Sequence, residues 1–67
     1  MSNFVSRLFV EKSKLGSNIE KLKAFIISDK FDGLPDIDRS DLKEQLEHME
    51  KYHSVLSRRV SRQCNNA

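Results

Sequence analysis

The chain has 67 residues, which is enough for one small domain. Its 12 Lys and Arg against 10 Asp and Glu give a formal net charge of +2, too close to neutral for nucleic-acid binding by bulk charge. With 33% charged and 37% hydrophobic residues, two Gly and one Pro, the composition favours soluble amphipathic helices over disorder or a turn-rich β fold.

The sequence also excludes several classes of protein. A single cysteine, Cys64, excludes an internal disulfide framework and a zinc site built from cysteines. No apolar run approaches the roughly 20 residues that span a bilayer. The first residues lack the charged-then-apolar pattern of a signal peptide. We therefore expect a soluble cytoplasmic protein with no membrane partner.

The first predicted helix covers about residues 3–29. Its apolar residues follow a spacing of three and four that only Lys12 interrupts, which is typical of a long amphipathic helix. These residues are Val5, Leu8, Leu15, Ile19, Leu22 and Ile26. Gly16 costs roughly 1 kcal/mol relative to Ala in mid-helix, which fits a position where a neighbouring element approaches closely.

A turn is predicted at residues 30–37. Gly33 suits the left-handed position after a helix end, and Pro35 prevents the first helix from continuing. Because the connection is so short, the helices on its two sides must pack antiparallel.

The second predicted helix covers about residues 38–62 and precedes a frayed tail at 63–67. Asp38 is its expected N-cap, with Ile37 and Leu42 at the spacing of a hydrophobic staple. Its stripe is Leu42, Leu46, Met49, His53, Leu56 and Val60. The predicted fold class is thus all-α, a single-domain antiparallel two-helix hairpin over residues 1–67.

In this hairpin, residues whose numbers sum to about 68 face one another, so that Leu8 faces Val60. Two helices cannot bury every apolar side chain, because several lie beside the main stripe. These are Phe4, Phe9, Phe25, Ile27, Tyr52 and Val55. We expect the hairpins to assemble into a homo-oligomeric helical bundle, a dimer or larger, that covers this patch. The alternative is a monomer whose segment from Phe4 to Phe9 folds over the hairpin.

Charge is distributed unevenly along the predicted hairpin. The turn region carries five Asp against Lys30 and Arg39. The open end carries the basic residues Arg7, Lys12, Lys14, Arg58, Arg59 and Arg62. An oligomer could gather several of these basic ends around one anion. The alternative is an ordinary solvated surface in which Glu11 pairs with Arg59.

Seven residues near the open end are candidate ligand contacts. Lys and Arg bind phosphate groups, and Tyr52 has the ring needed to stack on a base. His53 could touch a ligand beside Lys12 and Gly16. The alternatives are a packing role for Tyr52 and a buried, locally hydrogen-bonded His53. The candidates are Arg7, Lys12, Tyr52, His53, Arg58, Arg59 and Arg62.

The sequence predicts a binding protein that is not an enzyme and has no cofactor or metal. It has no Gly-rich phosphate loop and no His-x-x-x-His pair. The helically spaced Glu44, Glu47 and Glu50 lack the second acidic helix of a di-iron site. Cys64 has no His partner that would make it a nucleophile. Helix-turn-helix DNA binding fits poorly because that motif uses shorter, crossed helices.

Two sequence motifs, Lys-Leu-x-x-Phe-Ile and Gln-Leu-x-x-Met-x-x-Tyr, lie in the first and second predicted helices, respectively. The residues that accompany and include them are Arg7, Leu8, Glu11, Leu15, Ile19, Lys21, Leu22, Phe25, Ile26, Ser28, Phe31, Leu34, Leu42, Gln45, Leu46, Met49, Tyr52, Val55, Leu56 and Arg59. Over about residues 7–59 this pattern resembles small helical-hairpin bacteriophage proteins of the crAss-like phage related family. The resemblance implies a phage-encoded accessory protein acting in the cytoplasm of the infected bacterial host.

In size, hairpin form and expected oligomerisation, the chain also resembles phage anti-CBASS and anti-Thoeris proteins that sequester nucleotide immune signals. It lacks the Gly-Tyr-Arg opening of the anti-CBASS hairpin, so no binding residue is carried over. The resemblance implies an anti-defence homo-oligomer that holds a cyclic or ADP-ribose-type nucleotide between subunits. A protein-binding inhibitor of a host enzyme, acting through the acidic turn, and a purely structural oligomer stay open as alternatives.

Overall fold

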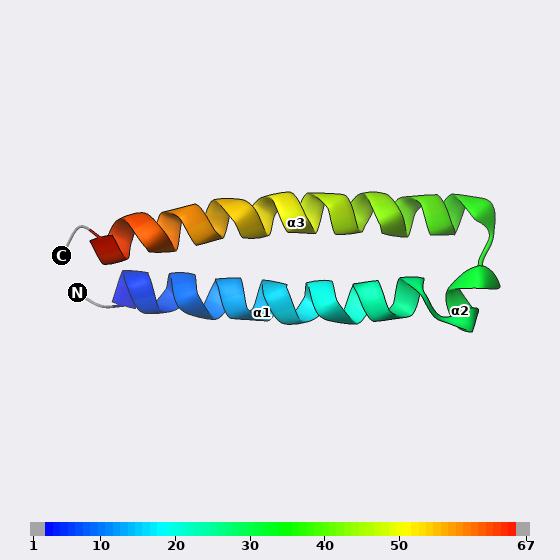
Figure 1. The fold of residues 1–67 in the computed structure, drawn as a ribbon, viewed down its shortest axis with the longest axis horizontal. Coiled ribbons are helices and arrows are strands. Elements are labelled where there is room, and N and C mark those ends of the chain that lie inside the picture. The colour runs from blue at the N-terminus through cyan, green and yellow to red at the C-terminus, as the bar shows by residue number, and fades with distance from the viewer. Residues whose placement is uncertain (1–2, 66–67) are drawn as a thin grey trace.

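The computed structural model describes residues 3–65 as an elongated helical hairpin (Figure 1). Helix α1 spans Asn3–Ile26, the short helix α2 spans Asp29–Asp32, and α3 spans Asp36–Asn65. No strand occurs in this part of the chain. The two long helices lie side by side and antiparallel, with the start of α1 beside the end of α3 and with α2 at the opposite end of the hairpin. The predicted all-α fold with a long helix pair is confirmed.

Helix α1 ends at Ile26, earlier than the predicted end near residue 29. The Ser28 hydroxyl donates a hydrogen bond to the Phe25 carbonyl at 2.6 Å, and the Ser28 backbone N–H donates to the same oxygen at 3.0 Å. A serine side chain that bonds the backbone locally competes with continuation of a helix. Ser28 therefore ends α1 before Gly33 or Pro35 is reached.

The turn region, predicted to be irregular, contains α2. Its residue Phe31 is buried, and the ring meets Phe25 edge-on with the ring centroids 6.1 Å apart. The Lys43 Nζ lies 5.8 Å from the Phe31 ring centroid. A single helical turn is unstable by itself. Burial of this aromatic ring against the long helices gives the turn the stabilisation that its backbone lacks.

Two details of the predicted turn are wrong. Gly33 has φ −82°, in the right-handed region, and its N–H donates to the Lys30 carbonyl at 3.3 Å. Helix α3 begins at Asp36, so Asp38 lies inside the helix and is not its N-cap. The Pro35 carbonyl accepts the first helical hydrogen bond, from the Arg39 N–H at 3.1 Å.

The start of α3 also lacks the predicted hydrophobic staple, because Ile37 is 70% exposed. An ion pair between the Arg39 guanidinium and the Asp36 carboxylate reinforces the first turn instead. At the other end, α3 continues through the predicted fraying point to Asn65, since no Gly or Pro interrupts it. Arg62 lies in its last turn, where a cation interacts favourably with the helix dipole. Residues 66 and 67 of the predicted tail lie outside the described residues.

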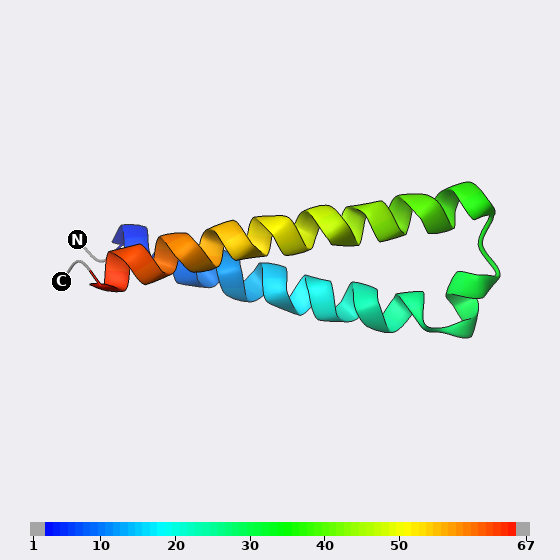
Figure 2. The ribbon, with the colours of Figure 1, turned by 45° about the horizontal axis from the view of Figure 1, so that its top comes forward.

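The apolar core is thin and strongest near the chain ends. Leu8, Leu56 and Val60 form one buried cluster, with the half-buried Leu15 packed against it. The presence of Leu8 and Val60 in the same cluster agrees with the predicted register. Figures 1 and 2 show that the long helices diverge from this end toward α2. The buried apolar side chains of the described residues are Leu8, Ile19, Phe31, Leu56 and Val60.

Much apolar surface stays uncovered on this hairpin, which measures 49 × 14 × 14 Å. Five of the six side chains predicted to lie beside the main stripe are exposed, and Phe25 is half-buried against Phe31. The exposed five are Phe4, Phe9, Ile27, Tyr52 and Val55. Val10 and Ile37 are also exposed. None of the described helices combines the length and apolar character needed to cross a membrane.

Candidate functional site

Two contacts between α1 and α3 mark opposite flanks of the hairpin. On one flank, the Tyr52 hydroxyl donates a hydrogen bond to the Glu11 carboxylate. On the other flank, Gly16 lies so close to His53 that a Cβ placed on the glycine would be 3.4 Å from the His53 Nε2. Successive residues of an α-helix point about 100° apart. Tyr52 and His53 therefore diverge to the two sides of the core.

The flank that carries Tyr52 continues along both helices at helical spacing. Positions three, seven and ten residues apart share one side of a helix. Starting from Phe4 on α1 and Tyr52 on α3, this spacing collects eight residues, which we call the tyrosine face. They are Phe4, Arg7, Glu11, Lys14, Tyr52, Val55, Arg59 and Arg62. The face therefore combines cations from both helices with exposed apolar side chains.

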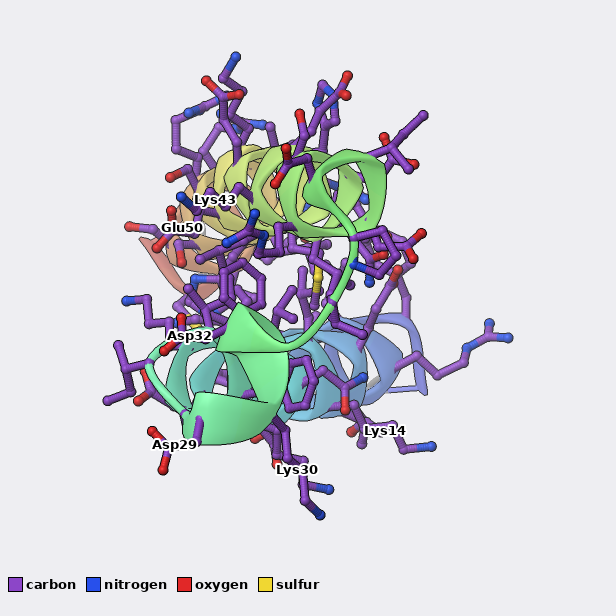
Figure 3. The ribbon with its side chains drawn as sticks, turned by 90° about the vertical axis from the view of Figure 1, so that its right-hand side faces the viewer. Lys14, Asp29, Lys30, Asp32, Lys43 and Glu50 are labelled. Atoms are coloured by element: carbon purple, nitrogen blue, oxygen red, sulfur yellow. The ribbon has the colours of Figure 1, made fainter. Side chains whose placement is uncertain are left out.

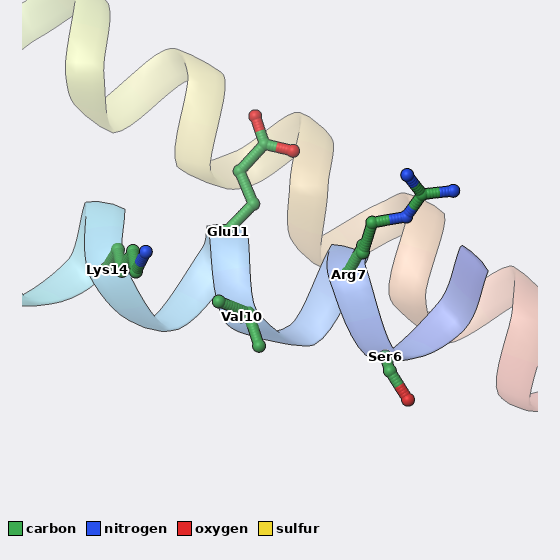
Figure 4. Close-up of a pocket in the computed structure, with 5 residues that line it drawn as sticks. All are labelled: Ser6, Arg7, Val10, Glu11 and Lys14. Atoms are coloured by element: carbon green, nitrogen blue, oxygen red, sulfur yellow. The ribbon is translucent and has the colours of Figure 1, made fainter. Parts of the chain in front are cut away.

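A groove of about 690 Å³ runs along α1 beside the Glu11–Tyr52 contact. Its lining residues all belong to α1, and they are Ser6, Arg7, Val10, Glu11 and Lys14. Figure 4 shows Arg7 and Glu11 projecting from one side of α1 and Ser6 and Val10 from the other. Two cations thus lie next to an exposed apolar side chain. The groove can hold an anionic group but encloses it from one side only.

Tyr52 is the aromatic centre of the tyrosine face. Its side chain is 43% exposed, so part of the ring is accessible, while the hydroxyl is bound to Glu11. The solvated-surface alternative requires an ion pair between Glu11 and Arg59. That pair is not among the ion pairs of the described residues. The Glu11 carboxylate instead orients the ring. Arg59 is half-buried and takes part in none of the ion pairs of the described residues.

The seven predicted contacts do not all share this face. Four of them lie on the tyrosine face, namely Arg7, Tyr52, Arg59 and Arg62. Lys12 lies one helical turn from Gly16, on the same flank as His53. Arg58 is exposed and, as the neighbour of Arg59, points about 100° away from it. The open end thus carries three differently directed sets of polar side chains.

The flank around His53 is built differently. His53 is half-buried and lines a cavity of about 310 Å³ together with Lys23 and Glu50, whose Nζ and Oε2 atoms are 3.2 Å apart. Figure 3, viewed from the turn, shows Glu50 and Lys14 on opposite sides of the hairpin. Here the cation and the carboxylate neutralise each other. This flank therefore has less unbalanced positive charge than the tyrosine face.

Sequence reasoning missed four members of the tyrosine face as site residues: Phe4, Glu11, Lys14 and Val55. Helical spacing from Arg7 would have found Glu11 and Lys14, because they follow it by four and seven positions. No group of three or more His, Cys, Asp or Glu side chains in residues 3–65 is arranged to hold a metal ion.

The family model for Sequestin matches residues 2–62 of the chain. The chain belongs to the Sequestin family. The match covers the tyrosine face from Phe4 to Arg62 and both flanks of the hairpin. The name Sequestin suggests sequestration of a molecule, a binding role rather than a catalytic one. No curated protein and no solved structure matches the chain. The relation to crAss-like phage proteins stays a prediction.

Proposed function

We propose that this member of the Sequestin family is a phage-encoded counter-defence protein that acts in the cytoplasm of the infected bacterium. A homo-oligomer of the hairpin sequesters a cyclic or ADP-ribose-type nucleotide immune signal between its subunits. The tyrosine face carries this proposal, since an accessible aromatic ring lies on the same face of the hairpin as Arg7, Arg59 and Arg62. The family name supports sequestration as the mode of action.

The chemistry of a nucleotide matches this combination of side chains. Its phosphates accept paired hydrogen bonds from guanidinium groups, which stay charged at every physiological pH. Its base is flat and stacks on an aromatic ring such as that of Tyr52. Because Glu11 holds the Tyr52 hydroxyl, the ring is oriented before the ligand arrives. Sequestration needs affinity alone, so no catalytic group is required.

The remaining predicted contacts have a secondary role in this proposal. Lys12 and His53 lie on the opposite flank from Tyr52, and Arg58 points away from Arg59. Lys12 and Arg58 add to the positive charge of the open end, which attracts an anion from a distance. Contacts within hydrogen-bonding range are assigned to the tyrosine face.

A thermal-shift panel tests the proposed function. It contains cyclic di- and trinucleotides, ADP-ribose derivatives and a short single-stranded DNA, each at moderate salt. A ligand at 100 times its dissociation constant adds about 2.7 kcal/mol to the free energy of unfolding, a clear rise in melting temperature for a small domain. We expect one class of nucleotide, and not the DNA, to give this rise. A panel without any rise would refute nucleotide sequestration.

Two arginine variants test the assignment of residues. Arg59→Ala removes a guanidinium from the tyrosine face and is expected to abolish the nucleotide-induced shift while the oligomer persists. Arg58→Ala is the matched control, because it removes the same charge from the neighbouring position on another side of α3. Undiminished binding by Arg59→Ala, or equal losses in both variants, would contradict the assignment to this face.

A second candidate function is inhibition of a host defence enzyme through the acidic turn. Five exposed carboxylates on α2 and the first turns of α3 share the turn end of the hairpin with the strongly exposed Ile37, which offers a protein partner an apolar side chain beside acidic groups. They are Asp29, Asp32, Asp36, Asp38 and Asp41. A pull-down from bacterial lysate tests this candidate. A stoichiometric partner that an Asp32→Asn, Asp38→Asn, Asp41→Asn variant fails to capture would favour it over nucleotide sequestration.

A further inference from the structure

The hairpin exposes more surface than a compact protein of its size. Its accessible surface is 5094 Å², about 700 Å² more than the roughly 4,400 Å² expected for a folded monomer of this mass. Each partner in a standard protein–protein interface buries about 800 Å². The excess surface is therefore close to what one interface covers.

The exposed apolar side chains gather in the half of the hairpin that carries the chain ends. We define this open half as residues 3–15 and 52–65, and the turn half as residues 16–51. Five of the seven exposed large apolar side chains of the described chain lie in the open half, namely Phe4, Phe9, Val10, Tyr52 and Val55. Three of these five belong to the tyrosine face. An apolar interface would form there rather than near the turn.

The groove along α1 lies in the same open half and is incomplete. All of its lining side chains project from one helix, so one side of the groove faces solvent. A second hairpin on the tyrosine face would provide the opposite wall. Arg7 and Lys14, which belong to both the groove and the tyrosine face, would then line a space between two copies of the chain.

Positive charge opposes this contact when no ligand is present. The open half carries six Lys and Arg against Glu11 alone, a formal charge of +5. The turn half carries six Lys and Arg against nine Asp and Glu, a formal charge of −3. Two open halves in contact therefore repel each other. A multivalent anion between them would reverse that repulsion.

We propose that two copies of the chain pack tyrosine face against tyrosine face over their open halves, with the two turns pointing apart, and that a polyphosphate anion in the shared groove drives this assembly. The arrangement rests on the proposed function, because the anion is the phosphate part of the sequestered nucleotide. By linkage, the anion tightens the dimer by the same factor by which dimerisation tightens anion binding.

A head-to-tail dimer is the competing arrangement, because it would pair basic open halves with acidic turn halves. Charges on exposed side chains are largely screened beyond about 8 Å at physiological ionic strength, whereas burial of apolar surface does not depend on such screening. A head-to-tail pair would also place the turn half, with its few exposed apolar side chains, opposite Tyr52 and Val55. The two arrangements respond to salt in opposite directions.

Sedimentation velocity of the full chain distinguishes them. We expect the dimer dissociation constant to fall about tenfold when NaCl rises from roughly 50 to 500 mM, because screening removes the repulsion between open halves. We expect inorganic tripolyphosphate at low salt to tighten the dimer further than NaCl of equal ionic strength does. A dimer that weakens as NaCl rises, or that ignores tripolyphosphate, would overturn the proposal.

Three variants locate the interface. Val55→Lys places a charge on the tyrosine face and is expected to weaken the dimer at least tenfold, whereas Ile37→Lys, the control at an exposed apolar position near the turn, leaves it unchanged. Arg59→Glu reduces the repulsion and is expected to tighten the ligand-free dimer at low salt. Circular dichroism checks that each variant stays helical. Equal effects of the two Lys variants, or a weaker dimer with Arg59→Glu, would refute the arrangement.

The outcomes separate this arrangement from the proposed function. A chain that binds a nucleotide in the thermal-shift panel but sediments as a monomer with tripolyphosphate would overturn the face-to-face dimer and leave sequestration standing. A chain that dimerises as described but binds no nucleotide would support the interface and overturn sequestration.

Discussion

Replacement of Phe31 tests whether the turn is held by a packed aromatic ring. Phe31 is 4% exposed, meets Phe25 edge-on at 6.1 Å, and has the Lys43 ammonium 5.8 Å from its centroid. Phe→Ala changes in protein cores cost about 3–5 kcal/mol. Of this loss in stability, the aromatic pair accounts for about 0.5–1.5 kcal/mol and an exposed cation–π contact for about 0.5–1 kcal/mol.

We expect Phe31→Ala to lower the free energy of unfolding by about 3 kcal/mol, the lower end of the core range, because the long helices diverge around this ring. A core of fewer than 70–80 residues rarely provides more than about 3–5 kcal/mol, so the variant would be only marginally folded at 25 °C. Phe31→Leu keeps most of the apolar burial and should lose only the energy specific to the aromatic ring, about 1–2.5 kcal/mol.

Urea unfolding followed by circular dichroism measures these differences. Protein concentration is held constant, because association with a second copy would change apparent stability. Ile27→Ala is the control for loss of an apolar side chain near the turn, since Ile27 is 86% exposed and should change stability by less than about 0.5 kcal/mol. Equal stability of the Phe31→Ala and Ile27→Ala variants would show that the ring does not hold the turn.

Three further substitutions have clear expected outcomes in the same unfolding assay. Leu56→Ala should cost about 2–5 kcal/mol, because Leu56 is 0% exposed; a loss below 1 kcal/mol would contradict the core assignment. Gly16→Ala should stabilise α1 by up to about 1 kcal/mol, because alanine favours the helix and its methyl group fits in contact with the His53 ring at 3.4 Å. Gly16→Leu should destabilise the hairpin, because the larger side chain would collide with that ring. Lys23→Met should cost less than about 1 kcal/mol, because Lys23 and Glu50 are both about half exposed.

The long helices and their register could be predicted because burial repeats with the period of the helix. Leu8, Leu56 and Val60 stand on the predicted stripes, and all three are buried in one cluster. On the first helix, Lys12 occupies a position in the stripe where an apolar residue is expected, and it is half-buried in the structure. A long aliphatic stem lets a lysine cover apolar surface while its ammonium reaches solvent, so the interruption did not break the helix.

The turn could not be predicted in the same way, since four residues are too few to show a period. Phe31 is buried only because the two long helices diverge and leave a place for its ring, and that divergence depends on contacts far apart in the sequence. The Ser28 hydroxyl ends α1 by a local hydrogen bond that competes with the helix, whereas Gly33 and Pro35 are more conspicuous in the sequence.

The sequence could predict how far along the hairpin each candidate site residue lies. It could not predict on which side of the helix pair each side chain lies. Summing residue numbers places Arg7, Lys12, Arg58 and Arg59 at the same end. Direction depends on the angle between each side chain and the seam of the two helices, which the Glu11–Tyr52 hydrogen bond reveals. Two neighbours in sequence, such as Arg58 and Arg59, therefore belong to different surfaces.

In the proposed anion-driven dimer, the thin core would link stability, assembly and ligand binding. The core of a hairpin of this size rarely provides more than about 3–5 kcal/mol, and a ligand at 100 times its dissociation constant adds about 2.7 kcal/mol. The two quantities are similar, so a bound anion would change the population of the folded, assembled state strongly. An exposed aromatic among arginines weakens the isolated hairpin through repulsion and uncovered apolar surface. In the proposed dimer, the same side chains would become favourable once a second copy and an anion cover them, because sequestration requires only that the ligand be held.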